Sequence, residues 1–463
     1  MAQRQMPDGP MGNSHWEPRV APRLKGDVVF EGDAGYDAAR KVWNGVIDKR
    51  PAMIAYCTDA EDVALAVIFA RSHRFGIAVR SGGHNIAGLS VCDGGMVIDL
   101  SRMKRIEVDP VRRVARAEAG LNLGEFDRAT QEHGLATTMG VNSDTGIAGL
   151  TLGGGFGKLG RKYGLTCDNL IAADVVTAEG KVLRASATEN ADLFWGLRGG
   201  GGNFGIVTAF EYRLHAIGTS LLVASALHRY DQAREAMRFY DEFARNAADE
   251  VNVDAALVTL PSGERFFSIS SSHIGAHHDG GRALSPIVKF GTPVETRLAT
   301  VPYLDIQSGG DAVFPRGRRY YWKAQFLREI GAGAIDALLD AYATAPNTAS
   351  LVVFQHVGGA IARVPVSDSP YGNRDAAFDC FPVAIWDDSA EDDANMGWAR
   401  ALWSAVRPYS TGGVYANNLG DEGEDRVRDA YGENYARLVA LKDKYDPTNF
   451  FRLNQNIRAT PSA

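Results

Sequence analysis

The stretch Arg80-Ser81-Gly82-Gly83-His84-Asn85 is the one around which the rest of the chain is organised. It follows the short apolar run 76–79, which predicts a buried strand that ends abruptly at the paired glycines. Glycines at such a turn accept positive φ and carry no Cβ, so a ligand can come close to the backbone. Successive exposed N–H groups there form an anion-binding nest, with His84 held beside it. For His84 alone, an ordinary surface turn with a satisfied histidine is the alternative interpretation.

The size and composition of the chain indicate a soluble protein of two or more domains. It has 463 residues, of which 45% are hydrophobic and 23% charged, and a single core rarely extends beyond about 300 residues. The 51 glycines are about 11% of the chain, against a usual value of about 7%. Because they are clustered, they indicate loops that wrap a ligand.

Charge and cysteine usage exclude several classes of function. The net charge of −7 gives no general basic field for nucleic acid. The four cysteines, Cys57, Cys92, Cys167 and Cys380, are scattered along the chain, so neither a disulfide framework nor a metal site is expected. Reduced thiols in a cytoplasmic protein are the simplest interpretation. The first 20 residues lack an apolar signal-peptide core, and no apolar run is long enough for a membrane span.

The first half of the chain mixes predicted strands and helices, as in an α/β or α+β domain. Helical spacing predicts helices over 36–47, 123–133 and 191–195. A further helix is predicted to start at a cap formed by Thr58 or Asp59. Apolar or alternating runs predict strands over 52–56, 76–79, 96–100, 113–119, 170–177, 181–185 and 206–214.

Two further glycine runs lie at 140–157 and 197–205. Each contains the spacing G-x-G-x-x-G, starting at Gly155 and at Gly200. A Rossmann dinucleotide site needs a strand directly before these glycines and a long helix after them. The first run is followed by a hairpin and the second leads into a strand, so a Rossmann fold is disfavoured.

After about residue 216 the pattern becomes that of an antiparallel sheet with helices on one face. Strands are predicted over 255–260, 266–272 and 350–358, and helices over 231–247 and 333–342. An amphipathic helix is predicted over 426–444, ended by Asp446-Pro447.

Taken in order, four motifs resemble the vanillyl-alcohol-oxidase/p-cresol-methylhydroxylase flavoprotein superfamily, and more narrowly its berberine-bridge-enzyme-like FAD-linked oxidases. These motifs are RSGGH at 80–84, GLTLGGGFG at 149–157, LFWGLRGGGGNFG at 193–205 and KYDPTNFFRLNQNI at 444–457. The resemblance covers nearly the whole chain. It implies an α+β fold with a two-part FAD-binding domain of the vanillyl-alcohol-oxidase type and an antiparallel-sheet substrate domain covered by helices.

The expected domain boundaries follow from the resemblance and the change of pattern. An N-terminal extension would cover 1–26, and the FAD-binding domain 27–215, with two subdomains split near 105. The substrate-binding domain would cover 216–411. A C-terminal segment, 412–463, would return to the FAD-binding domain.

The resemblance also implies how FAD is held. In the family, the histidine that corresponds to His84 bonds to the 8α-methyl group of the flavin, and glycine loops wrap the pyrophosphate and ribityl chain. The residues expected to bind the cofactor are Arg80, Ser81, Gly82, Gly83, His84, Asn85, Gly88, Ser90, Gly140, Asn142, Gly146, Ile147, Gly149, Gly155, Gly205, Val207, Tyr415, Asn417 and Asn454.

A second, cysteinyl link is not expected. Some relatives carry a cysteine eleven residues before the Gly-Gly-Gly run, and here Asn142 stands at that position. Cys167 lies on the other side of the glycines and is expected in the core. A single covalent bond, through His84 only, is therefore predicted.

For the chemistry, the resemblance points to the C-terminal Tyr-x-Asn motif, Tyr415 to Asn417, and to the strand 378–386. The motif is followed by Asn418 where many relatives have tyrosine, so the tyrosine-base mechanism of the family does not transfer directly. Period two places Asp379 and Phe381 on one face, which makes Asp379 a candidate base; an edge position or a salt bridge is the alternative. Tyr320, Tyr321, Trp322 and Lys323 are expected to form another strand with aromatic and cationic groups, for which a place in the core is the alternative. The residues expected to contact the substrate are Tyr321, Lys323 and Phe381.

The expected activity is oxidation of an alcohol, sugar or heterocyclic metabolite at a C–OH or C–N carbon, with O₂ reduced to H₂O₂. Thr145 stands at the position that gates O₂ in the family, and it is smaller than the leucine of dehydrogenase-type relatives. A flavin dehydrogenase with another electron acceptor and a flavin-holding protein with little turnover are the alternatives. The expected partners are a small-molecule substrate and O₂, without nucleic acid or membrane, for a monomer or homodimer.

Overall fold

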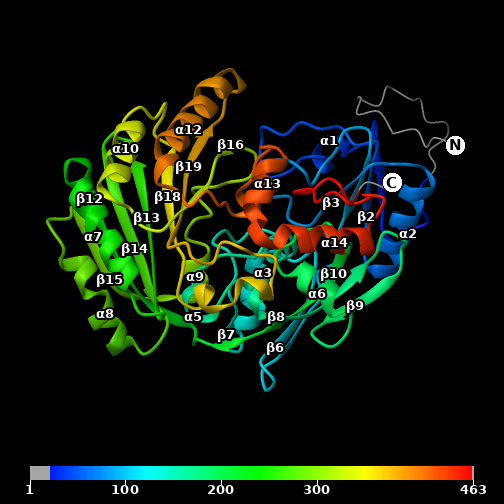
Figure 1. Cartoon of the computed structure of the whole chain (residues 1–463), viewed down its shortest axis with the longest axis horizontal. Helices are drawn as coiled ribbons and strands as arrows, with labels where there is room; N and C mark the ends of the chain where they lie inside the picture. Colours follow the sequence, from blue (N-terminus) through cyan, green and yellow to red (C-terminus); the bar gives the residue numbers. More distant parts are fainter. Residues whose placement is uncertain (1–20, 461–463) are drawn as a thin grey trace.

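Two sheets that carry the flavin-type motifs and one large sheet opposite them make up the molecule (Figure 1). The structure is a computed structural model that describes residues 21–460. Residues 1–20 of the expected N-terminal extension lie outside the described residues.

The first sheet has four strands in the order β1-β2-β4-β3. Strands β2, β4 and β3 run parallel and β1 is antiparallel to β2. The elements are β1 (Val28–Phe30), α1 (Tyr36–Ala39), β2 (Met53–Tyr56), α2 (Ala60–Ser72), β3 (Ile77–Arg80) and β4 (Met96–Asp99). The Asp59 side chain caps α2 by accepting from the Asp62 backbone N–H, as predicted. The motif around His84 begins where β3 ends.

The second sheet has five antiparallel strands in the order β5-β6-β10-β8-β9. Two short strands, β7 and β11, pair beside it. The elements of this part are β5 (Ile106–Asp109), β6 (Val114–Glu118), α3 (Leu123–Gln131), β7 (Leu135–Ala136), α4 (Ile147–Leu152), α5 (Gly160–Tyr163), β8 (Leu170–Val176), β9 (Val182–Ser186), α6 (Ala191–Leu197), β10 (Ile206–Arg213) and β11 (His215–Ala216).

The third sheet is antiparallel, in the order β15-β12-β14-β13-β18-β19-β16, with β17 also paired to β19. Its strands are β12 (Ser220–Arg229), β13 (Val251–Thr259), β14 (Arg265–His273), β15 (Glu295–Pro302), β16 (Arg319–Trp322), β17 (Gln325–Leu327), β18 (Leu351–His356) and β19 (Phe378–Trp386). Its helices are α7 (Ala233–Asn246), α8 (His277–Lys289), α9 (Tyr303–Gln307), α10 (Ala332–Tyr342), α11 (Ala360–Arg363) and α12 (Asp392–Val406). In Figure 1, α7, α8, α10 and α12 lie on the outer face of this sheet, so the predicted α+β fold with a helix-covered antiparallel sheet is confirmed.

Strand β19 is buried on both faces because it lies between two cores. Cys380, Ala384 and Trp386 pack into the core beneath the outer helices, whereas Phe381 and Val383 pack into the core shared with the first two sheets. The strand therefore turns its odd-numbered residues, Asp379 included, towards the motifs.

The last segment returns to the first two sheets through α13 (Glu424–Tyr431) and α14 (Tyr435–Tyr445). Lys442 is fully buried, and its Nζ donates to the backbone carbonyls of Asn203 and Phe451 and to Asp446 Oδ2 (2.7–2.9 Å). The C-terminal motif is thus tied directly to the third glycine run.

Two predicted helices differ from the structure, and one helix was not predicted. The expected helix over 36–47 is only the single turn α1, because the chain then leaves the surface to bring Trp43 against Phe314 and Tyr320. The expected helix over 426–444 is two helices, separated at Gly432, which has a φ of 51°. The glycine loop 140–157 contains the unexpected helix α4.

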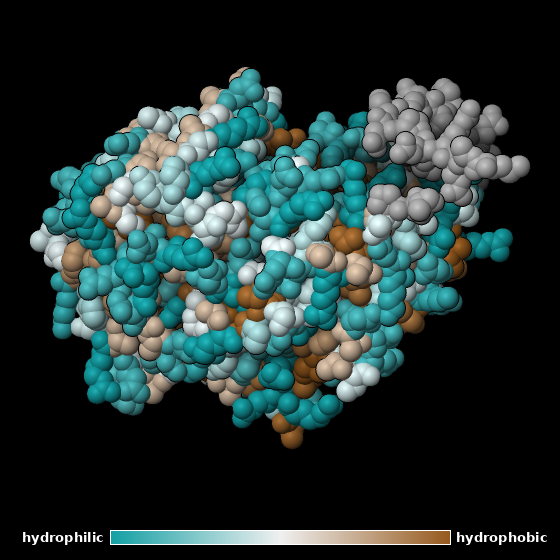
Figure 2. Space-filling model, in the orientation of Figure 1, coloured by the Kyte–Doolittle hydropathy of each residue, from teal (hydrophilic) through white to brown (hydrophobic). Residues whose placement is uncertain are grey.

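Within the described residues, no helix is long and apolar enough to cross a bilayer. Figure 2 shows a face that is mostly hydrophilic, with hydrophobic residues scattered over it.

Candidate active site

A cavity of about 410 Å³ lies where the three glycine runs, the inner face of the third sheet and the C-terminal segment meet. This volume is typical of small-molecule sites, which range over about 300–1,000 Å³. Of the residues expected at the site, those that line the cavity are Ser81, Gly82, Gly83, His84, Asn85, Ser90, Gly140, Asn142, Thr145, Gly146, Gly149, Gly205, Val207, Phe381, Tyr415, Asn417 and Asn454.

The first two glycine runs cross each other backbone to backbone. A Cβ on Gly82 would overlap the Gly146 backbone nitrogen, and a Cβ on Gly146 would overlap Gly82 in return. The turn is held further by Ser81, whose hydroxyl donates to the Ala119 carbonyl (2.6 Å). Gly83 has a φ of 72°, so the turn needs glycine at both positions, for two different reasons.

The turn leaves its donors free. Among the described residues, the backbone N–H groups of Gly82, Gly83, His84 and Asn85 have no hydrogen-bond acceptor. Glycines of the other two runs leave room in the cavity. Gly149 and Gly202 both line it, and a Cβ on either residue would meet no protein atom within 4 Å. A run of free amides facing glycine walls fits the pyrophosphate and ribityl chain of FAD.

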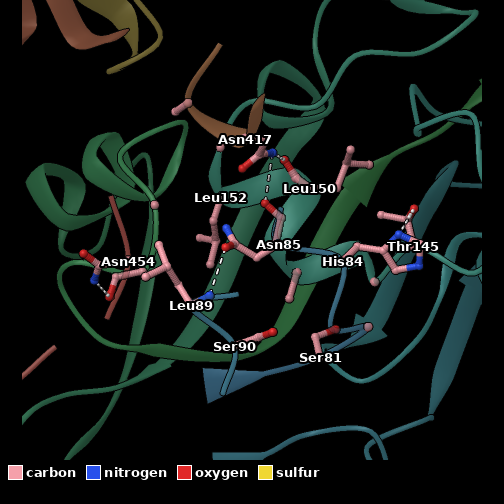
Figure 3. Close-up of a pocket in the computed structure, with 18 of the residues that line it drawn as sticks. Ser81, His84, Asn85, Leu89, Ser90, Thr145, Leu150, Leu152, Asn417 and Asn454 are labelled. Atoms are coloured by element: carbon pink, nitrogen blue, oxygen red, sulfur yellow. Dashed lines mark hydrogen bonds between the residues drawn. The ribbon is translucent and has the colours of Figure 1, made fainter. Parts of the chain in front are cut away.

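Buried polar atoms along the cavity also fit a polar cofactor. Within residues 21–460, Ser90 Oγ, Asn454 Oδ1 and Tyr431 Oη have no partner in the protein. Figure 3 shows Asn454 on one side of the cavity, His84 with Thr145 on the other, and Ser90 between them. An unsatisfied buried polar atom costs about 1–3 kcal/mol, and a ligand with several polar groups would satisfy them.

His84 is held from three directions. Its ring stacks on Trp43 with ring centroids 5.0 Å apart, its Nδ1 lies 3.5 Å from Thr145 Oγ1, and its Nε2 lies 3.2 Å from Asp144 Oδ2. Burial lowers the pKa of His84, although Asp144 acts in the opposite direction. The imidazole is therefore neutral at physiological pH.

The Tyr-x-Asn motif fixes the wall formed by the second glycine run. Asn417 Nδ2 donates to the carbonyls of Gly149 and Leu150 and to Tyr415 Oη, which also accepts from the Gly155 backbone N–H. A Cβ on Gly153 would overlap the Asn417 side chain. Burial raises the pKa of Tyr415, so the phenol stays protonated and its hydrogen is free for a third partner.

Asp379 lies one layer behind the cavity. The carboxyl is fully buried, and its Oδ2 accepts a hydrogen bond from Asn418 Nδ2 (2.7 Å). Asn418, unlike Asp379, lines the cavity. Burial raises the pKa of Asp379 to about 8, against a smaller opposing effect of Asn418. Among the described residues Asp379 Oδ1 has no partner, so neither an edge position nor a salt bridge explains this carboxyl.

Several expected site residues lie outside the cavity. Arg80 pairs with Asp99 behind the turn, where it lines a second, smaller cavity. Tyr321 turns to the outer face, where its hydroxyl accepts from Arg400 on α12, and Lys323 pairs with Glu422. Three residues expected to bind the cofactor contact protein atoms instead: Gly88 packs against Ile47, Gly155 packs against Thr166, and Ile147 lies in the hydrophobic core.

The sequence did not single out Trp43 and Gln355, which line the cavity. Trp43 stacks on both His84 and Tyr320, and Gln355 comes from β18. Trp322, in the expected strand that became β16, also lines the cavity. The alternation of β16 could have indicated Trp322, because its neighbours Tyr321 and Lys323 must point the other way. No pattern in the sequence places Trp43 there.

All four cysteines are buried and free. Cys167 lies in a core cluster with Phe156 and Tyr415, as expected, and not in the cavity. Asn142, at the position of the second link, uses its Oδ1 to accept from the Asp144 backbone N–H.

Comparison with known proteins gives consistent similarities. Residues 51–186 match the family described as "FAD binding domain", and residues 414–458 match "Berberine and berberine like". An FAD-linked oxidoreductase of Dictyostelium discoideum is 31% identical over 439 residues, covering 94% of this chain and 95% of that protein. (R)-6-hydroxynicotine oxidase of Paenarthrobacter nicotinovorans is 31% identical over 461 residues, covering 94% and 97%. The crystal structure of 6-hydroxy-D-nicotine oxidase from Arthrobacter nicotinovorans superposes with a TM-score of 0.89 at 27% identity, covering 95% and 99%.

Proposed function

The chain belongs to the berberine-bridge-like FAD-linked oxidoreductases, and from this we propose that it is an oxidase that takes a hydride from a C–OH or C–N carbon of a small neutral substrate and reduces O₂ to H₂O₂. The observation that carries the proposal is the lining of the cavity: aromatic and apolar side chains of the third sheet line it together with His84 and Thr145, and Trp322 packs against Trp43, which stacks on His84. FAD, when bound, supplies the hydride acceptor and returns the electrons to O₂.

The substrate end is apolar and uncharged. It is lined by Phe314, Trp322, Val353, Phe381 and Val383, with the neutral amides of Gln355 and Asn418 between them. Among the cavity-lining residues that the structure describes, none is Asp, Glu, Lys or Arg. Such a lining favours an uncharged alcohol or amine on an aromatic or alicyclic ring over an oligosaccharide, which needs a denser set of polar partners.

The chain's own groups then divide the work. Trp322 Nε1, buried and without a partner within the described part of the chain, is available to orient a substrate oxygen or nitrogen. The Tyr415 hydroxyl, held by Gly155 and Asn417, donates its free hydrogen at the same end. Asp379 is the proposed general base for the substrate's O–H or N–H proton; because it lies behind Asn418, the proton must reach it past that side chain, directly or through one water.

FAD is held, in this proposal, by the free amides of residues 82–85 and by Ser90, Gly146, Gly149, Gly205 and Asn454 along the cavity. His84 forms the single covalent bond to the flavin. Residues 27–215 with 412–463 would form the FAD-binding unit and 216–411 the substrate-binding unit.

Thr145 is the proposed gate for O₂ beside His84. Thr145→Leu adds branched bulk there and should slow reoxidation of the reduced flavin by O₂ about tenfold or more, equivalent to about 1.4 kcal/mol on the barrier. Stopped-flow reoxidation of fully flavin-loaded protein measures this rate, with Thr145→Ser as the control that keeps the space open. Reoxidation on the scale of minutes in the wild type would favour the dehydrogenase alternative, and equal rates in wild type and Thr145→Leu would remove Thr145 as the gate.

A panel of uncharged cyclic alcohols and amines, and a matched panel of sugars, tests the substrate class. Anaerobic bleaching of the flavin by members of the first panel is expected. Bleaching by the sugars alone would contradict the inferred substrate end, and bleaching by neither would favour a flavin-holding protein with little turnover.

A further inference from the structure

Asp144 contacts His84 on the side away from the cavity. Its Oδ2 lies 3.2 Å from His84 Nε2 and accepts from Arg316 Nε at 2.9 Å. Arg316 also donates through Nη2 to the Gly82 carbonyl (2.7 Å), so one guanidinium holds both the carboxylate and the turn that presents His84. Arg316 comes from the loop after α9, far from the other two residues in the sequence.

The charges of these groups decide which nitrogen of His84 is reactive. Burial alone would raise the pKa of Asp144, but hydrogen bonds from His84 and Arg316 outweigh it and lower that pKa. A carboxylate beside a neutral imidazole accepts the Nε2–H proton, which leaves the lone pair on Nδ1. Nδ1 is the nitrogen beside Thr145, a residue that lines the cavity.

A route to solvent lies behind the same carboxylate. Asp144, Arg316, Ser81 and Gly82 line the smaller cavity, of about 270 Å³, on the outer side of the turn. The Asp144 side chain is 45% exposed, whereas that of His84 is 15% exposed. A proton taken from His84 can therefore leave through Asp144 without crossing the FAD cavity.

We propose that Asp144, oriented by Arg316, is the positioning residue and proton acceptor for covalent attachment of FAD to His84. This inference rests on the proposed function of His84. Attachment breaks one C–H bond of the flavin 8α-methyl group and forms one C–N bond to His84 Nδ1. The methyl proton and the two electrons of the C–H bond pass to the flavin, which is thereby reduced, and the Nε2 proton passes to Asp144. One O₂ then removes two electrons and two protons as H₂O₂, so one H₂O₂ is formed for each FAD attached.

The test follows covalent incorporation of FAD into apoprotein. The readouts are the gain in intact mass, the flavin retained after acid precipitation, and H₂O₂ released before any substrate is added. Asp144→Asn keeps an acceptor for Nε2–H but cannot take the proton. It should bind FAD non-covalently as wild type does, yet attach it at least about tenfold more slowly. Asp144→Glu, which restores a carboxylate, should recover part of the rate.

Asp387→Asn is the matched control. Asp387 also pairs with an arginine, Arg318, two residues from Arg316, but does not contact His84. This variant should attach FAD at the wild-type rate. Arg316→Gln, which leaves Asp144 without its arginine, should slow attachment without abolishing it.

The outcomes separate this inference from its premise. If wild type itself retains no flavin after precipitation, covalent attachment at His84 fails. If wild type attaches FAD and His84→Ala does not, but Asp144→Asn and Arg316→Gln attach it within about twofold of wild type, the role of Asp144 is overturned and that of His84 stands. If Asp144→Asn does not fold, the Arg316→Gln rate decides: an unchanged rate contradicts the proposal.

Discussion

Asp379 illustrates how a single position in a strand acquires chemistry from its surroundings. Strand β19 crosses between two cores, so an inward residue there has no access to water. The only hydrogen-bond partner of the Asp379 carboxyl among the described residues is Asn418, from the C-terminal segment. Burial without a cation favours the neutral acid, which gives this carboxyl a pKa of about 8, close to the pH at which a general base works well.

The first prediction at the residue scale concerns the pH profile. A general base must be ionised, so kcat/KM for the best substrate should rise with pH and level off above about 8. Asp379→Asn should lower the rate by about 100- to 10,000-fold and remove this limb. Steady-state kinetics from pH 6 to 9.5 measure both effects; a limb that survives in Asp379→Asn belongs to another group.

A second prediction concerns stability. An unfolded chain loses the Asp379 proton near pH 4, whereas the folded protein keeps it up to about pH 8. Because the folded state binds the extra proton in this window, Asp379 makes the free energy of unfolding fall as pH rises through it. Urea unfolding at pH 5 and pH 8 should show a smaller fall for Asp379→Asn than for wild type. Asp127, whose pKa burial raises to about 7, is present in both proteins and cancels from the comparison; equal falls would place the proton elsewhere.

At the scale of elements, the glycines of the loops serve two separate purposes. Gly82 and Gly146 allow two backbones to touch, whereas Gly149 in α4 faces open space in the cavity. Similar sequence runs thus contain glycines required by protein packing and glycines that leave room for a ligand.

A pair of variants distinguishes these purposes. Gly146→Ala forces apart the two crossing loops and should lower the free energy of unfolding by about 1–3 kcal/mol. Gly149→Ala improves helix propensity by up to about 1 kcal/mol and should leave the fold intact, but it should weaken FAD binding to apoprotein. Urea unfolding and fluorescence titration with FAD give the two quantities; a Gly149→Ala variant that binds FAD as tightly as wild type would show that the cofactor does not pass this wall.

The elements that local sequence determines were predictable, and those that distant contacts determine were not. The cap of α2 at Asp59 and strands in all three sheets, such as β3, β8 and β13, follow from local pattern, whereas β1, β5, β12 and β15 were not predicted. The chain after Ala39 abandons its helical pattern because Trp43 gains a stack with Tyr320, almost 280 residues away. The same limit applies to the site: the family resemblance pointed to His84 and the Tyr-x-Asn motif, but the contacts that Asp144 makes with His84 and Arg316 depend on a distant part of the chain.

At the scale of the whole molecule, the C-terminal segment completes the cavity begun by the first half of the chain. Its anchor is the buried pair Lys442–Asp446, in which all three Lys442 protons are donated and Asp446 also accepts from the backbone N–H groups of Phe450 and Phe451. Removal of one partner would leave the other charge buried and unpaired.

Lys442→Met should therefore lower the free energy of unfolding by about 3–5 kcal/mol and weaken FAD binding, since Asn454 follows the anchor. Lys444 lies on the same helix as Lys442, and Lys444→Met breaks its exposed pair with Asp192. This variant should lower the free energy of unfolding by less than about 1 kcal/mol. Thermal unfolding with and without FAD compares the two variants. Equal losses in both would mean that the buried pair is not the anchor.

The measurement that tests the central claim most directly is acid precipitation of the purified protein and of His84→Ala, followed by intact mass analysis of the pellets. The wild-type pellet should stay yellow and carry the mass of one FAD. Because Asn142 offers no second attachment point, the His84→Ala protein should release all of its flavin into the supernatant. Flavin retained in the His84→Ala pellet, or released from the wild type, would contradict a single covalent bond through His84.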